Sequence, residues 1–248
     1  MTFKDHFSSI SKGYSKHRPR YPDELYEFIL KNVKERKNAW DCATGNGQAA
    51  IELAKYFDQV YATDASKAQI DQAIPHAKVK YSVAPAESSG LPSEHFDLIT
   101  IAQALHWFDF NRFYEEVQRV ASPNALIAAW SYGLLTTQNA DLDEVILEFY
   151  DGIVGPYWPP ERKYTQEKYE TIPFAFEEME TPTFHMKLQH DLDSLVNYLN
   201  TWSAVKNYRE ELKRDPIPEL RKKLSLNWKQ EKIETKTPIY LKMGKVFK

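Results

Sequence analysis

Apolar runs and amphipathic segments alternate along the first half of the chain. Leu25, Phe28 and Ile29 follow the three- and four-residue spacing of one helix face, and the apolar run at 96–102 is typical of a fully buried strand. On these criteria we expect strands at 38–42, 60–63, 78–83, 96–102 and 125–130, and helices at 22–33, 50–57, 66–74 and 109–120. Such alternation predicts an α/β fold, in which helices cover both faces of a parallel sheet.

After Tyr132 this alternation stops. The elements expected there are a helix at 142–152, a proline- and aromatic-rich loop at 156–160, a strand at 183–189, a helix at 192–207 and a terminal strand at 237–246. Residues 206–236 carry charges of both signs, which predicts a solvated surface.

Three units are expected along the chain. They are an N-terminal helical lid segment (1–36), an α/β core (37–132), and a lid insertion with C-terminal strands that complete the sheet (133–248). The lid is expected to come from residues 133–189 together with the N-terminal segment.

The composition of the 248-residue chain is that of a globular protein, with 42% hydrophobic residues and a formal net charge of −3. This charge does not favour nucleic acid or acidic membranes as partners, and no apolar run approaches the ~18 residues of a membrane span. The single cysteine, Cys42, excludes an internal disulfide and fits a reducing compartment. The scattered histidines predict no metal site. We therefore expect a cytoplasmic monomer or homodimer whose partner is a small molecule.

A glycine-containing turn follows the first expected strand, from Asp41 to Gly47. In open α/β sheets, ligands bind outside the carboxyl ends of the strands, where the strand order reverses. Gly45 and Gly47 allow the backbone to approach such a ligand closely. Asp64 lies at the end of the next strand, where a carboxylate can accept hydrogen bonds from ribose hydroxyls. Together these residues predict a site for a nucleoside-containing cofactor.

The turn and Asp64 fit a nicotinamide dinucleotide as well as S-adenosylmethionine, so other features must separate the two. The carboxylate of Asp41 can pair with an amino group, which a nicotinamide cofactor does not present there. Ala86 and Glu87 follow the third strand, in the position for contacts with the edge of adenine. Both features favour S-adenosylmethionine. A nicotinamide-dependent oxidoreductase and a non-catalytic protein that binds S-adenosylmethionine or S-adenosylhomocysteine remain as alternatives.

Several short strings, spread over nearly the whole chain, occur together in one known family. They are Arg18-Pro19-x-Tyr21-Pro22, 41–48, 64–66, Ala86-Glu87, Ala104-Leu105-His106-Trp107-Phe108-Asp109 and 198–203. On these strings the chain resembles the class I S-adenosylmethionine-dependent methyltransferases of the type-11 group. It is most similar to the subgroup of trans-aconitate methyltransferases and the related yeast drug-resistance methyltransferase. The resemblance implies a Rossmann-like seven-stranded sheet with helices on both faces, the last strand inserted antiparallel, and a lid subdomain.

The same resemblance implies which residues bind the cofactor. The family's first glycine in the turn is Ala43 here, and its methyl group is expected to be tolerated if φ stays negative. Tyr14 and Arg18 would fold over the cofactor, and Gln103 would lie beneath its methionyl part. The full expected set is Tyr14, Arg18, Asp41, Ala43, Gly45, Gly47, Asp64, Ala65, Ala86, Glu87 and Gln103.

The methyl acceptor is expected to bind in an aromatic pocket beneath the lid. The candidate substrate-binding residues are Trp107, Tyr157, Trp158, Arg162 and Trp202. The alternative for Tyr157 and Trp158 is that they only stabilise a loop. The subgroup's carboxyl methylation, with Arg162 and Arg20 available, favours a small organic acid. A carboxylate needs no general base, whereas a phenol or amine can require one, and His106 is then the best-placed catalytic candidate unless it is simply a core residue.

Overall fold

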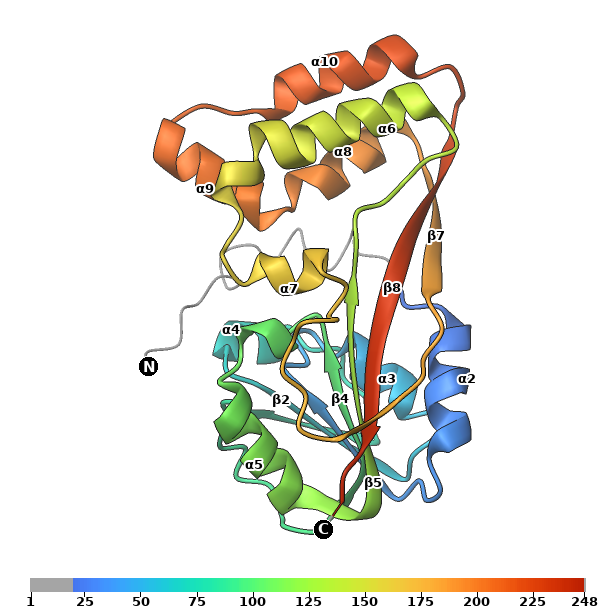
Figure 1. Cartoon of the computed structure of the whole chain (residues 1–248), viewed down its shortest axis with the longest axis vertical. Coiled ribbons are helices and arrows are strands. Elements are labelled where there is room, and N and C mark those ends of the chain that lie inside the picture. Colours follow the sequence, from blue (N-terminus) through green and yellow to red (C-terminus); the bar gives the residue numbers. More distant parts are fainter. Residues whose placement is uncertain (1–19, 248) are drawn as a thin grey trace.

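A central eight-stranded sheet organises the protein, and the computed structural model describes residues 20–247 of it. The strand order is β3-β2-β1-β4-β5-β8-β6. In addition, β7 pairs with β8, and the two strands lie side by side (Figure 1). The parallel strands are β1 (Asn38–Cys42), β2 (Gln59–Asp64), β3 (Val79–Val83), β4 (Phe96–Ala102) and β5 (Ala121–Tyr132). The last strand, β8 (Ile233–Lys245), runs antiparallel beside β5. The expected α/β class and the antiparallel last strand are both confirmed.

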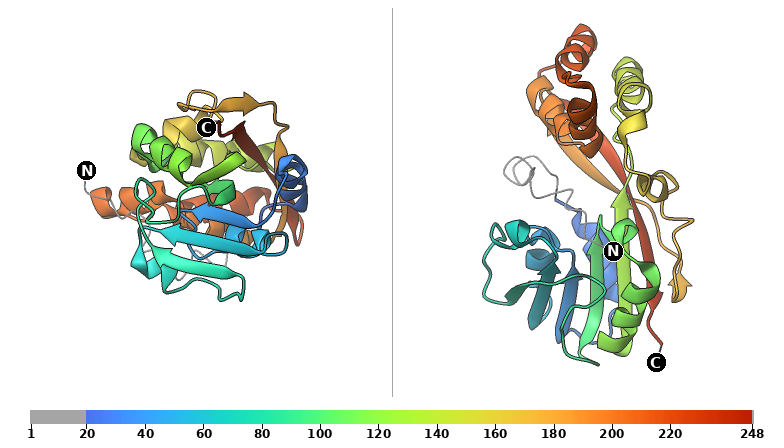
Figure 2. Two further views of the ribbon diagram at one scale, coloured as in Figure 1. Left: turned by 90° about the horizontal axis from the view of Figure 1, so that it is seen from below. Right: turned by 90° about the vertical axis from the view of Figure 1, so that its left-hand side faces the viewer.

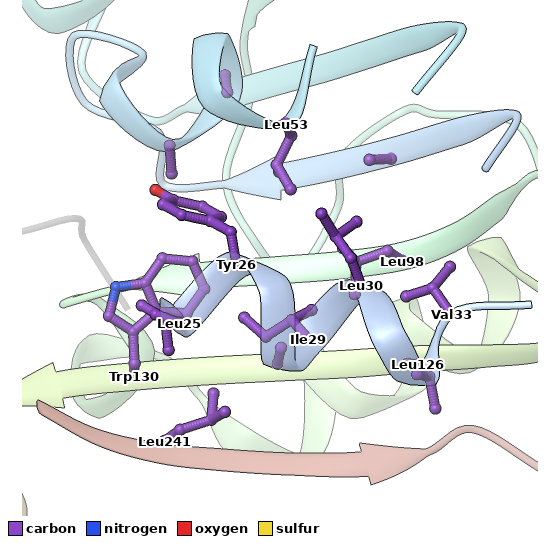
Figure 3. Close-up of a cluster of buried hydrophobic side chains, with 14 of the residues drawn as sticks. Leu25, Tyr26, Ile29, Leu30, Val33, Leu53, Leu98, Leu126, Trp130 and Leu241 are labelled. Atoms are coloured by element: carbon purple, nitrogen blue, oxygen red, sulfur yellow. The ribbon is translucent and has the colours of Figure 1, made fainter. Parts of the chain in front are cut away.

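Helices pack on both faces of the sheet because alternate residues of each buried strand point to opposite sides. On one face, α2 (Asp23–Asn32) and α3 (Gln48–Leu53) bury Leu25, Ile29 and Leu53 against the strands (Figure 3). On the other face, α5 (Phe110–Val120) is packed through the apolar stripe of its phenylalanines and valines. The short helix α4 (Lys67–Ile70) ends four residues earlier than expected. The chain continues in turns, and the N–H of Ile74 donates to the carbonyl of Asn46 at 3.0 Å instead of to a helical partner.

The outer edge strand is divided in two, which gives eight strands instead of the expected seven. Both β6 (Glu177–Met179) and β7 (Phe184–His190) pair with β8, in registers that join Met179 to Met243 and Phe184 to Ile239. Between them, Pro182 has no backbone N–H to donate to the hydrogen bonds that pair the strands. The side chain of Thr181 instead donates to the carbonyl of Leu241 at 2.6 Å.

A helical lid stands over the carboxyl ends of the parallel strands (Figures 1 and 2). It consists of α6 (Ala140–Leu147), the π-helical turn η2 (Glu148–Ile153), η3 (Gly155–Tyr157), α8 (Leu192–Asn200), α9 (Ser203–Leu212) and α10 (Ile217–Asn227). These elements share an apolar core of their own. The charged stretch 206–236 is therefore not only solvated surface: most of α9 and all of α10 lie within it, and Leu220 and Leu224 are buried.

The chain between the two parts of the lid returns to the sheet. Helix α7 (Arg162–Gln166) lies under the lid, and Tyr169, Ile172 and Phe176 then pack with α5 on the sheet face. Residues 133–189 are thus shared between lid and sheet, which corrects the expectation that they form the lid. The described part of the N-terminal segment, residues 20–36, carries α2 against the sheet. Within residues 20–247, no helix has the length and apolar character needed to cross a membrane.

Candidate functional site

The turn after β1 lies at the point where the strand order reverses between β1 and β4. The backbone is left-handed at Ala43 (φ 54°), Gly45 (φ 57°) and Gly47 (φ 87°). The N–H of Thr44 donates to the carbonyl of Thr63 at 2.9 Å, which fixes the turn to β2. The condition under which the methyl group of Ala43 was expected to be tolerated, a negative φ, is not met, because the residue is held in a conformation that favours glycine.

Asp64, at the end of β2, is built into this turn. One carboxylate oxygen accepts the N–H of Gly45 at 2.8 Å, and the other accepts the N–H of Ser66 at 2.8 Å. Ala65, the next residue along the chain, is half-buried. A carboxylate at the end of the second strand is the group that accepts ribose hydroxyls in folds of this kind. The structure thus links the two parts of the predicted cofactor site.

Asp41 is a buried carboxylate without a cationic partner among residues 20–247. Its two oxygens accept the hydroxyls of Thr44 at 2.5 Å and Thr100 at 2.8 Å. Burial raises its pKa to about 6, and the charge of Asp64 adds to that rise, while the two hydroxyls oppose it. An ammonium group near Asp41 would offset the burial of this charge. The chemistry of the site therefore fits the amino group of an amino-acid-containing cofactor.

Gly47 is required by packing that the sequence alone does not reveal. A Cβ added there would lie 2.2 Å from the hydroxyl oxygen of Tyr81, on β3. That hydroxyl donates to the carbonyl of Ile74 at 2.8 Å. Tyr81 thus closes over the turn, and no sequence signal distinguished it from an ordinary strand residue.

The loop after β3 holds Ala86 and Glu87, the residues expected beside adenine. Ala86 is buried, and the carboxylate of Glu87 accepts the N–H of Asp109, the N-cap residue of α5, at 3.1 Å. Glu116 on α5 anchors the same loop by accepting the N–H of Ser89 at 2.8 Å. Its ion pair with Arg119 lowers the pKa of Glu116 to about 2, and the hydrogen bonds from Ser89 add to this.

Gln103 follows β4 with a left-handed backbone (φ 61°), and its N–H donates to the carbonyl of Trp130 at 2.8 Å. Its side-chain Nε2 is buried and has no hydrogen-bond partner in the part of the chain that the structure describes. A buried donor without a partner is costly, so this nitrogen fits a ligand that supplies an acceptor. Tyr14 and Arg18, also expected at the cofactor, lie outside the described residues.

A cavity of about 70 Å³ lies between the carboxyl end of the sheet and the lid. Most of the expected acceptor residues meet here, although they come from separate parts of the chain. Its lining is Gln103, His106, Trp107, Tyr132, Gly133, Leu134, Trp158, Pro159, Arg162, Tyr198, Thr201, Trp202 and Ser203. Tyr157 does not line it: its ring packs on Tyr208 with centroids 5.0 Å apart.

Arg162 is held on this wall by aromatic rings. Its guanidinium lies 4.6 Å from the ring centroid of Trp158 and 5.7 Å from that of Tyr150, and its Nε donates to the Tyr150 hydroxyl at 3.2 Å. No carboxylate within residues 20–247 pairs with it. Arg20 is exposed and is not part of the cavity lining. Tyr150, which the sequence analysis missed, is thus a main support of Arg162.

His106 is buried, and its Nδ1 lies 2.8 Å from the hydroxyl of Tyr169. Burial lowers the pKa of His106 to about 3, and the positive charge of Arg162 contributes to the lowering. The imidazole is therefore neutral across the physiological pH range and only weakly basic. These properties favour hydrogen bonding over proton abstraction at this position.

Comparisons with known proteins agree on one family. A family model described as a methyltransferase domain matches residues 40–129. A Dictyostelium discoideum protein that carries the name of a methyltransferase is 36% identical over 251 residues, with 98% of this chain and 95% of that protein covered. A solved structure from Anaeromyxobacter dehalogenans, whose name gives a type II methyltransferase, is 39% identical with a TM-score of 0.86, covering 93% of this chain and 98% of that one. A Saccharomyces cerevisiae protein named as an S-adenosylmethionine-dependent methyltransferase is 28% identical over 56% of this chain and 50% of its own length.

Proposed function

Since this chain belongs to the S-adenosylmethionine-dependent methyltransferases, we propose that it methylates a small organic acid on a carboxylate oxygen. One observation carries the proposal. Arg162 is a cation without a carboxylate partner among residues 20–247, and it lies on the wall of a small cavity lined by aromatic rings. An acid that enters this cavity supplies the missing anion. A bidentate contact of guanidinium with carboxylate also fixes the orientation of that anion.

The residues around the β1 turn would hold the cofactor. Asp41 offers a buried carboxylate for its amino group, Asp64 offers acceptors for the ribose, and Gln103 offers an unpartnered amide donor. When bound, S-adenosylmethionine supplies a methyl group on a positively charged sulfur. Gln103 also lines the acceptor cavity, so the cofactor site and the acceptor site are adjacent.

The residues of the cavity would position the acceptor and keep water away. Trp158 and Trp202 contribute apolar walls, with ring centroids 5.6 Å apart, and Arg162 orients the acid. Orientation of this kind supplies a large part of the acceleration of a transfer reaction. A carboxylic acid is already ionised at neutral pH, so no residue has to remove a proton. This agrees with the weak basicity of His106.

Methyl transfer onto an acceptor panel tests the proposal. The purified protein and methyl-labelled S-adenosylmethionine are incubated with carboxylic acids, phenols and amines, and the products are treated with alkali. We expect label in alkali-labile esters of small acids. Label in phenols or amines, with none in acids, would overturn the proposal.

The proposed role of Arg162 is tested by its substitution, with substitution of a second arginine as the matched control. Arg162→Gln is expected to raise KM for the acid about 30-fold, as for loss of a charge-assisted hydrogen bond worth about 2 kcal/mol. Arg214→Gln removes an equal charge from an exposed position of the lid and is expected to leave KM unchanged. Equal effects of the two substitutions would contradict a specific role for Arg162.

A further inference from the structure

Tyr169 is placed against His106 by an unusual piece of backbone. Lys168 and Tyr169 are both left-handed, with φ of 56° and 62°, directly after α7. Consecutive non-glycine residues in this region carry strain, which persists only where surrounding structure holds it. The result is that the Tyr169 ring is buried beneath the Leu105–Trp107 turn, with its hydroxyl 2.8 Å from Nδ1 of His106.

Of the two possible directions of the hydrogen bond between these side chains, only one satisfies the buried hydroxyl donor of Tyr169. A neutral imidazole has one N–H donor and one acceptor nitrogen. If Nδ1 accepts, the Tyr169 O–H is satisfied and the imidazole proton is on Nε2. If Nδ1 donates, the Tyr169 O–H has no acceptor within the described residues, although the side chain is fully buried. An unsatisfied buried donor is costly, so the first arrangement is favoured.

Nε2 is the ring nitrogen of His106 that Tyr169 does not engage. His106 lines the cavity together with Arg162. Its Nε2 makes no hydrogen bond within residues 20–247, yet it is not among the fully buried polar atoms. It is therefore open to a ligand. The low pKa of His106, caused by burial and by the charge of Arg162, keeps this nitrogen in a neutral ring.

We propose that Tyr169 is a positioning residue that holds His106 in the Nε2–H tautomer, so that His106 donates a hydrogen bond to an oxygen of the acceptor. This inference rests on the proposed function, because it assigns a second donor beside Arg162 to the same acid. A cavity that offers an N–H donor and a cation selects an anionic oxygen and rejects a protonated amine. His106 then selects and orients the acceptor without taking a proton from it.

Nitrogen NMR tests the tautomer without any acceptor. The full-length protein is labelled with 15N-histidine, and the His106 signals are assigned by their loss in His106→Gln. We expect a protonated Nε2 and an unprotonated Nδ1, with this pattern lost in Tyr169→Phe. Tyr164→Phe is the matched control, because its ring packs on Phe110 away from His106. A proton on Nδ1 in the unmodified protein would overturn the inference.

Kinetics on an acid identified by the acceptor panel test the donor role. His106→Gln keeps an amide N–H near the position of Nε2, and we expect KM to rise less than about fivefold with kcat unchanged. His106→Leu removes the donor, and we expect KM to rise about tenfold. A fall in kcat of about 100-fold in His106→Gln, with a single ionisation in the kcat profile, would instead identify a general base.

The acceptor panel and the NMR experiment test the two proposals separately. If no carboxylic acid is methylated, the proposed function fails, while the NMR arm still decides the tautomer. If acids are methylated but Nδ1 carries the proton, the proposed function stands and the role of Tyr169 is wrong. Circular dichroism and thermal unfolding of each variant show whether Tyr169→Phe remains folded.

Discussion

Three substitutions in the β1 turn separate backbone strain from steric overlap. Ala43, Gly45 and Gly47 all have positive φ, and of the two glycines only Gly47 lies against a bulky neighbour. A left-handed conformation costs an L-residue about 1–2 kcal/mol. Glycine avoids this cost, but it is more flexible in the unfolded chain, which offsets about 0.4–1 kcal/mol of the stability gained. Ala43→Gly is therefore expected to raise the free energy of unfolding by about 0.5–1 kcal/mol, and Gly45→Ala to lower it by about the same amount.

The effect at Gly47 is expected to be larger. A methyl group there would lie 2.2 Å from the Tyr81 hydroxyl and 2.8 Å from its ring, so the ring must move and its bond to the Ile74 carbonyl is lost. Overpacking typically costs about 1–3 kcal/mol, so with the strain Gly47→Ala is expected to lower the free energy of unfolding by about 2–4 kcal/mol. At Gly45 the added atom meets only a side-chain oxygen of Gln69 at 3.9 Å, so strain acts alone.

Denaturant unfolding of the three variants measures these differences. Thermal unfolding gives an independent reading, since about 1 kcal/mol corresponds to 2–4 °C in a chain of this size. Replacing Tyr81 with leucine in the Gly47→Ala background should recover part of the loss, because space for the methyl group opens. Destabilisation by Ala43→Gly, or equal losses at Gly45 and Gly47, would refute the reasoning.

The remaining predictions concern the two ligand sites and pH. Calorimetric titration should show binding of S-adenosylhomocysteine and no binding of NADH, and tighter binding of NADH would contradict the site assignment. Asp64→Asn should weaken S-adenosylhomocysteine binding about tenfold or more, because hydrogen-bond acceptors are lost. Burial raises the pKa of Asp41 to about 6, above its value in the unfolded chain, so the folded state binds the extra proton between about pH 4 and 6. The ligand-free protein should therefore gain stability from this group as pH falls through 6, a gain that Asp41→Asn abolishes and that is measured as the difference between the two unfolding profiles. Gln103→Leu removes the unpartnered buried amide and should weaken S-adenosylhomocysteine binding without lowering the melting temperature, whereas a large loss of stability would indicate a structural role instead.

Local patterns in the sequence determined the fold class and predicted where a cofactor site would lie. The strand at 96–102 could be predicted because burial on both faces of a sheet favours a nearly continuous apolar run. The turn at Asp41–Gly47 could be predicted because its left-handed backbone favours small residues. Asp64 could be placed beside the turn because the carboxyl ends of parallel strands lie at one edge of a sheet. None of these inferences needs a contact between distant segments.

Contacts between distant segments were decided only by the tertiary structure. Tyr169 meets His106 across 63 positions of the chain, and Tyr81 closes over Gly47 from β3, which is separated from β1 by β2. The division of the edge strand near Pro182, and the charged helices of the lid, likewise depend on which neighbour each segment packs against. Hydrophobic periodicity indicates which face of a segment is buried, but it does not indicate which other segment covers that face. Contacts between particular distant residues therefore cannot be read from the pattern. For the same reason the sequence showed Arg162 only as a charge. Its proposed contact with an acid depends on the aromatic rings and the cavity that the fold places around it.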